Sequence, residues 1–229
     1  MSWITVSVLA AATSAVVNIF DKRVIHGFAS TPLTLPFLVA IFQPLLGIII
    51  LLIADNPDGF SFWPYFSGFS SGMLFGLSGL IMIWTMFRNE VSRIVPIVQT
   101  FPVFTVLVAF VFLGEQLTML QLFAIVLAVL GGIVISVKYE SGISRSNLIN
   151  KSLAPLILSS FLLSVAYVAQ KLAVTSLPLL VAHGLRSVGL APVFGAFAIR
   201  REPIEDVIRL IKGRTMALPL VMINELIIA

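Results

Sequence analysis

Apolar segments of about 20 residues recur along the chain, and an α-helix of this length crosses about 30 Å of hydrocarbon. The 229-residue chain is 59% hydrophobic and 10% charged, whereas globular chains are about 45–50% apolar and 25% charged. So few charged side chains cannot cover a water-exposed surface. A soluble enzyme, a nucleic-acid-binding protein and a disordered chain are therefore excluded, and we predict an all-α, polytopic membrane protein.

The apolar segments predict seven complete membrane spans and a partial eighth. The eighth begins near Met216, and its 14 residues to Ala229 reach only about 21 Å as a helix. We therefore expect the chain to stop inside a span, as a truncated protein would. The seven complete spans are Trp3–Phe20, Leu33–Ile53, Ser67–Phe87, Ile94–Leu113, Met119–Val137, Leu153–Leu172 and Leu179–Ile199.

Basic residues alternate between the two sides of this predicted topology. Loops after the odd-numbered spans hold twelve of the fourteen, the opposite side holds only Lys171, and Arg186 lies within span 7. Because basic loops stay in the cytoplasm, we predict that the N-terminus lies outside. The twelve are Lys22, Arg23, Arg88, Arg93, Lys138, Arg145, Lys151, Arg200, Arg201, Arg209, Lys212 and Arg214.

The chain contains an internal repeat. Residues 18–22 at the end of span 1 match residues 167–171 at the end of span 6, at an offset of 149, and span 2 matches span 7 at an offset of 143. A unit of five spans has an odd number of crossings, so the second copy enters from the opposite side. Such inverted repeats are common in secondary transporters. The predicted units are 1–137, a cytoplasmic linker 138–152, and an incomplete second repeat 153–229.

Spans 4 and 5 carry the features of a known family. The stretch 92–136 contains Pro102-Val-Phe104, Phe112-Leu-Gly114-Glu115, Leu117-Thr118, Gln121 and Gly131. It closely resembles the EamA domain of the drug/metabolite transporter superfamily. The resemblance implies a ten-helix, two-repeat carrier of small organic metabolites that works by alternating access. The sequence has no Walker loop, dinucleotide fingerprint or H-E-x-x-H motif, so we expect no cofactor and no enzymatic activity. In that family the basic loop commonly follows span 2, whereas here residues 54–66 carry no base.

Polar groups inside hydrocarbon are costly and therefore mark candidate sites. Asn18 and Lys22, like Tyr167 and Lys171, are four residues apart, so each pair shares a helix face. One interpretation is that the lysines attract an anionic substrate from opposite mouths of a cavity; the other is that they snorkel to the headgroups.

Arg186 and Glu225 are the charged groups predicted deepest in the spans. Arginine keeps its proton and so needs a carboxylate, a cage of carbonyl groups or an anionic ligand. Glu225 has no basic neighbour in sequence, which suits reversible protonation in a proton-coupled carrier. The alternative interpretation is that the Glu225 side chain is simply exposed to water. At an offset of 140, Trp84 corresponds to Asn224, and we expect both to line the cavity.

The turn between spans 4 and 5 is expected to be structural. Thr118 and Gln121 have the spacing of a helix capping box, and with Pro102, Gly114 and Glu115 they form the motif of a short helix hairpin. Gln99 lies between Pro96 and Pro102, whose missing N–H groups leave backbone carbonyls unpaired, so span 4 is predicted to line the path. Glycines at every fourth position in span 3 predict close helix packing.

We expect a secondary transporter of amino-acid-like or related polar and amphipathic solutes, exporting them across a bacterial or archaeal plasma membrane. Its expected partners are the solute and the lipid bilayer, and protons are a hypothetical coupling ion. A truncated or degenerate carrier without transport activity is the alternative. An intramembrane enzyme is disfavoured because His26 and His183 are isolated.

Overall fold

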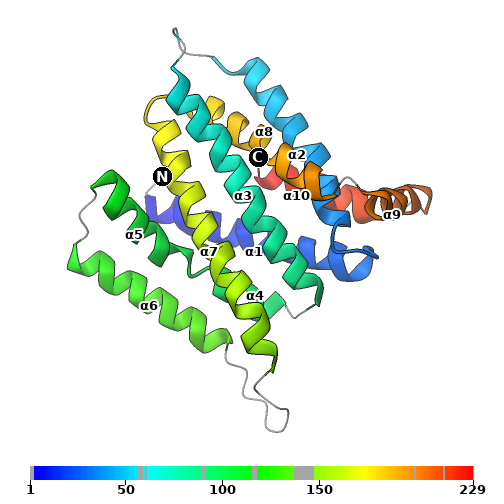
Figure 1. The fold of residues 1–229 in the computed structure, drawn as a ribbon, viewed down its shortest axis with the longest axis horizontal. Helices are drawn as coiled ribbons and strands as arrows, with labels where there is room; N and C mark the ends of the chain where they lie inside the picture. The colour runs from blue at the N-terminus through cyan, green and yellow to red at the C-terminus, as the bar shows by residue number, and fades with distance from the viewer. Residues whose placement is uncertain are drawn as a thin grey trace.

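The computed structural model describes residues 3–55, 59, 61–88, 91–114, 118–136, 147–198, 200–213 and 215–228. Within these residues the regular secondary structure is helical. Figure 1 shows α3 and α7 side by side across the middle of the molecule. The helices are α1 (Trp3–Gly27), α2 (Thr34–Ile53), α3 (Phe62–Arg88), α4 (Val91–Val98), α5 (Phe101–Leu113), α6 (Met119–Ser136), α7 (Asn147–Val174), α8 (Leu179–Ala198), α9 (Arg201–Lys212) and α10 (Ala217–Ile228).

Four of these helices, α2, α3, α7 and α8, are long and apolar enough to cross a membrane within the described residues. They coincide with predicted spans 2, 3, 6 and 7. Large apolar side chains also remain exposed, for example Phe112 on α5 and Leu120 on α6, as contact with lipid requires. The chain is therefore a multi-pass membrane protein.

Two features differ from the sequence-based expectation. Predicted span 4 is two helices, α4 and α5, and the loop after predicted span 7 contains the amphipathic helix α9. In addition, α7 begins at Asn147, inside the predicted linker, whose residues 138–146 lie outside the described part of the chain.

The break between α4 and α5 follows from proline chemistry. Pro102 has no N–H to continue the helical hydrogen bonds. At the break, the Thr100 backbone N–H at 3.1 Å and the Thr100 hydroxyl at 2.7 Å both donate to the Ile97 carbonyl. From the neighbouring α7, the Ser164 hydroxyl donates to the Phe101 carbonyl at 2.7 Å. Backbone carbonyls at the break thus accept hydrogen bonds from side-chain hydroxyls, which irregular backbone needs where it is shielded from water.

Helix α7 is joined to α3 by hydroxyl hydrogen bonds. Ser78 and Ser159, both fully buried, lie 2.9 Å apart, and each hydroxyl also contacts the other residue's backbone carbonyl. About two helical turns closer to the start of α3, the Ser71 hydroxyl donates to the Gln170 side-chain oxygen at 2.7 Å. These bonds fix the register of α7 along α3.

Helix α8 lies against α3 through glycine. A Cβ added to Gly72 would come within 2.0 Å of the Arg186 carbonyl oxygen, and one added to Gly76 would lie 3.3 Å from Val193. The glycines of α3 therefore form a close helix contact, which confirms the packing role predicted for them. The same contact holds the backbone of Arg186 in place.

We predict that Gly72→Ala lowers the melting temperature of the purified protein, whereas Gly131→Ala in α6 does not. Nothing lies within 4 Å of a Cβ at Gly131, and alanine is the better helix former by about 1 kcal/mol. The measurement is size-exclusion chromatography of detergent-solubilised protein after heating. Equal stability of the two variants would contradict the close α3–α8 contact.

Candidate functional site

A guanidinium group lies among aromatic rings contributed by neighbouring helices. The Arg186 Cζ atom on α8 is 4.1 Å from the ring centroid of Phe75 on α3 and 5.7 Å from that of Tyr167 on α7. Tyr167 in turn stacks on Phe101 at the start of α5, with centroids 5.1 Å apart. Four helices thus build one cation–aromatic centre, which we call the arginine centre.

The arginine centre has a charge that no described carboxylate neutralises. Among the residues that the structure describes, no ion pair joins Arg186 to an acidic side chain; the aromatic faces and the Tyr167 side chain are its neighbours. A guanidinium forms paired hydrogen bonds to carboxylate or phosphate, and the rings can pack against an apolar part of a ligand. The arrangement therefore suits an anionic or zwitterionic solute.

Acidic and amide side chains from three other helices form a second polar cluster, the acidic centre. The Asn224 amide on α10 donates to the Asp21 carboxylate on α1 at 2.7 Å. The next residue, Glu225, interacts with Gln43 on α2. Gln43, Asn224 and Glu225 are fully buried.

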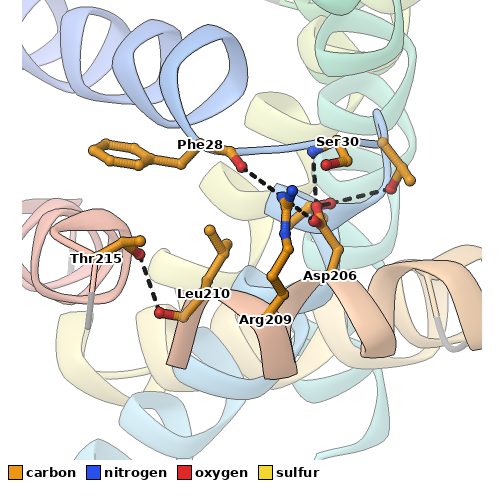
Figure 2. A network of polar contacts seen from close by, with 8 residues as sticks. Phe28, Ser30, Asp206, Arg209, Leu210 and Thr215 are labelled. Atoms are coloured by element: carbon orange, nitrogen blue, oxygen red, sulfur yellow. Dashed lines mark hydrogen bonds and ion pairs between the residues drawn. The ribbon is translucent and has the colours of Figure 1, made fainter. Parts of the chain in front are cut away.

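Helix α9 is tied to the connection between α1 and α2, as Figure 2 shows. The buried Asp206 carboxylate accepts hydrogen bonds from the Ser30 backbone N–H at 2.8 Å and from the Thr34 hydroxyl at 2.6 Å, and it pairs with Arg209. Arg209 also donates to the Phe28 carbonyl at 3.1 Å. We call this set the α9 network.

The α9 network joins α9 to the segment that follows α1 and to the start of α2, two of the helices that contribute to the acidic centre. Between α9 and α10, the Thr215 hydroxyl donates to the Leu210 carbonyl at 3.2 Å. Burial acts to raise the pKa of Asp206, but the hydrogen bonds from Thr34 and Ser30 and the Arg209 charge outweigh burial, so this pKa lies below its ordinary value of 3.8.

The other predicted cavity residues do not join either centre. The Asn18 amide donates to the Ser14 carbonyl of its own helix at 2.9 Å. Trp84 is 47% exposed, with the Arg88 guanidinium 4.4 Å from its ring. The side chains of three further predicted residues are exposed: Lys22, Gln99 and Lys171. The structure thus brings Tyr167 together with Arg186, and Asn224 together with Glu225, in two separate places.

The predicted hairpin motif shapes the end of α5 and the start of α6 and lies in neither polar centre. Gly114 ends α5 with φ at 65°, a left-handed conformation that favours glycine. The Gln121 side-chain oxygen accepts from the Thr118 N–H at 2.9 Å, and the Gln121 N–H donates to the Thr118 hydroxyl at 3.3 Å. This is the predicted capping box. Pro102 begins α5, and Glu115 lies outside the described residues.

A hollow of about 440 Å³ lies between the start of α3 and the second half of α7. It contains none of the predicted cavity residues and no charged side chain. Its lining is Trp63, Pro64, Phe66, Ser67, Ser70, Ala169, Leu172, Thr175 and Ser176.

Sequence reasoning missed the aromatic residues Phe75 and Phe101 of the arginine centre. It also missed three acidic or amide residues. Asp21 follows Asn18 by three residues and so shares its helix face, and Gln43 is a polar residue in a strongly apolar segment; both signals were present. Asp206 carried no such signal, because the loop after span 7 is rich in charged residues.

A family model described as the EamA-like transporter family matches residues 1–137 of the chain. The match therefore covers more than half of the sequence, from α1 through α6. No curated protein and no solved structure matches the chain.

We predict that Asp206→Asn destabilises the protein by about 2 kcal/mol at pH 7, the cost of weakening hydrogen bonds to a buried charge. The lowered pKa means that this stabilisation is complete above the ordinary value of 3.8 and is lost as the pH falls through the lower folded value. Chemical unfolding at pH 7 and in acid measures the difference between variant and wild type, which should shrink in acid.

The matched control for this variant is Glu205→Gln, one residue away on α9. Glu205 is exposed and pairs with Arg201 at 2.7 Å, and such surface pairs contribute little. A loss of stability as large as that of Asp206→Asn would contradict a specific role for the α9 network.

Proposed function

The chain belongs to the EamA-like transporter family, and we propose that it is a secondary transporter that moves small organic metabolites by alternating access. The observation that carries the proposal is the arginine centre. An arginine facing aromatic rings, with no carboxylate partner among the described residues, is an anion site inside a multi-pass membrane protein. Amino-acid-like solutes with a carboxylate and an apolar part match it best.

We further propose that the helices form an inverted repeat in which α1, α2 and α3 correspond to α7, α8 and α10. The packing supports this correspondence. Helix α3 packs along α7, as α10 packs along α1, and α8 contacts α3, as α2 contacts α10. Helices α2 and α8, which correspond to each other, pack together between the halves. Such pairs of halves alternate in exposing a shared site.

Export is the direction that we propose. With the N-terminus outside, Lys22 and Arg23 lie at the cytoplasmic mouth, and both are exposed. They would attract an anionic solute toward the arginine centre from the cytoplasm. The membrane proposed is the plasma membrane of a bacterium or archaeon.

Counterflow in proteoliposomes tests the proposed function. Vesicles loaded with a panel of unlabelled amino acids and carboxylic acids should accumulate at least one labelled member of the panel. We predict that Arg186→Gln lowers the initial rate at least tenfold, because about 1.4 kcal/mol of lost binding free energy is a factor of ten. Arg186→Lys should also be impaired, since lysine lacks the planar fork of arginine.

The matched control is Arg201→Gln, which removes an exposed arginine on α9 and should leave the rate unchanged. Size-exclusion chromatography of each variant separates loss of binding from loss of folding. Full exchange by folded Arg186→Gln, or no exchange of any panel member by the wild type, would contradict the proposal.

A further inference from the structure

The end of α1 and helix α9 meet on the side of the membrane that we predict to be cytoplasmic. The Ser30 N–H, just after α1, donates to the Asp206 carboxylate at 2.8 Å, and Arg209 donates to the Phe28 carbonyl at 3.1 Å, as Figure 2 shows. The connection after α1 and helix α9 follow predicted spans 1 and 7. They form one surface just beyond the apolar segments.

Two arginine side chains converge on the last turn of α1. A Cβ built on Gly27 would lie 3.8 Å from the Arg23 Cδ atom and 3.9 Å from its Nε atom, so the Arg23 side chain extends toward the end of α1. At the next residue, the Phe28 carbonyl holds Arg209. Asp206 neutralises Arg209, but neither ion pair in the described part of the chain involves Arg23. The Arg23 charge beside a second guanidinium favours an anion at this place.

The same turn of α1 borders a hollow of about 340 Å³, a volume within the range of small-ligand sites. Its three basic side chains are exposed. Ile19 lies one turn deeper in the predicted span, and its side chain is 64% exposed. The hollow therefore has an apolar end and a basic end, as a phospholipid has an acyl end and a phosphate end. Its lining is Ile19, Lys22, Arg23, His26 and Gly27.

The carboxylates next to this hollow have other partners. Asp21 accepts a hydrogen bond from the Asn224 amide, and Asp206 is paired with Arg209. The neighbouring helix α2 contains no charged side chain. The positive charge at the end of α1 is therefore available to a ligand.

The charges of α9 are divided along its length. Glu202 and Glu205 lie in the first half, where Glu205 pairs with Arg201 at 2.7 Å. Lys212 is exposed in the last turn. Seven residues separate Glu205 from Lys212, about 10 Å along a helix, which exceeds the Debye length of about 8 Å in physiological salt. The half of α9 that contacts the end of α1 is therefore its positive half.

One edge of α9 is apolar and remains outside the protein core. Ile204, Ile208 and Ile211 have the spacing of one helix edge, and Ile208 and Ile211 are 43% and 54% exposed. The buried side of the helix is formed by Pro203, Asp206, Val207 and Leu210. An exposed apolar edge together with basic residues is typical of helices that lie in the plane of the lipid headgroups.

We propose that the end of α1 and the last turn of α9 bind the headgroup of one anionic phospholipid. We call this place the lipid site, formed by Lys22, Arg23, His26 and Lys212 and held together by Arg209. The lipid phosphate contacts Arg23 in the hollow, and an acyl chain follows Ile19 toward the membrane interior. The negative surface charge of anionic lipids complements the site. One phosphodiester has a single negative charge, so Lys22 and Arg23 together keep a positive balance toward a solute.

Native mass spectrometry of the full chain, without any solute, tests the proposal. Protein freed of its own lipids is mixed in detergent with equal amounts of dioleoylphosphatidylglycerol and dioleoylphosphatidylcholine, which share acyl chains and differ in net charge. We expect the wild type to retain phosphatidylglycerol at least tenfold more often than phosphatidylcholine. Because each change removes a cation, Arg23→Gln should lower phosphatidylglycerol retention at least threefold, and Lys22→Gln combined with Arg23→Gln at least tenfold.

Two further variants serve as controls. Arg23→Lys keeps the positive charge and should stay within twofold of the wild type. Arg201→Gln removes an exposed arginine from the first turn of α9, where it pairs with Glu205, and should leave retention unchanged.

Equal retention of the two lipids by the wild type, a result that needs no variant, would overturn the proposal. Unchanged retention of phosphatidylglycerol by the folded double variant would also overturn it. Displacement of phosphatidylglycerol by an equal concentration of inorganic phosphate would assign the hollow to a free anion. Dimers that the double variant loses would assign the surface to a second copy of the chain. Either of these last results would contradict a lipid site.

Discussion

The close backbone approach of α8 to α2 and α3 is the constraint on which the rest of the structure depends. Lipid chains are as apolar as leucine, so helices in a membrane associate through tight packing and hydrogen bonds rather than through exclusion from water. A Cβ on Gly72 would strike the Arg186 carbonyl, and one on Gly47 would lie 2.8 Å from the Gly184 carbonyl. Glycine alone allows α8 to sit between the two helices and to aim Arg186 at the rings.

Two polar centres of opposite charge follow from this packing and from the hydroxyl bonds that hold α7 on α3. In the arginine centre a cation lies against aromatic rings, and in the acidic centre each of the two carboxyl groups interacts with a different amide side chain. The acidic centre is built by α1, α2 and α10. The arginine centre is built by the helices that the proposed repeat pairs with them, α7, α8 and α3, together with Phe101 on α5. The proposed repeat accounts for this likeness, and the two centres differ in charge.

Sequence reasoning recovered the features that depend on local spacing. Apolar length gave the four long helices, the glycine period gave the α3 contact, and the Thr118–Gln121 spacing gave the capping box. Sequence reasoning could not predict which distant segments pair, because local spacing carries no information about such contacts. Asp21 and Asn224, for example, are 203 residues apart. Helix α9 was missed because its apolar residues alternate with charged ones in a segment that hydropathy assigns to a loop.

The most direct test of the central claim, that two similar units face opposite ways, uses the absence of cysteine from the chain. Lys22→Cys and Lys171→Cys each introduce one thiol at an exposed, repeat-related position. A membrane-impermeant maleimide applied to intact cells should label Lys171→Cys, and Lys22→Cys should react only after the membrane is opened. Labelling of both thiols from the same side would contradict the inverted arrangement.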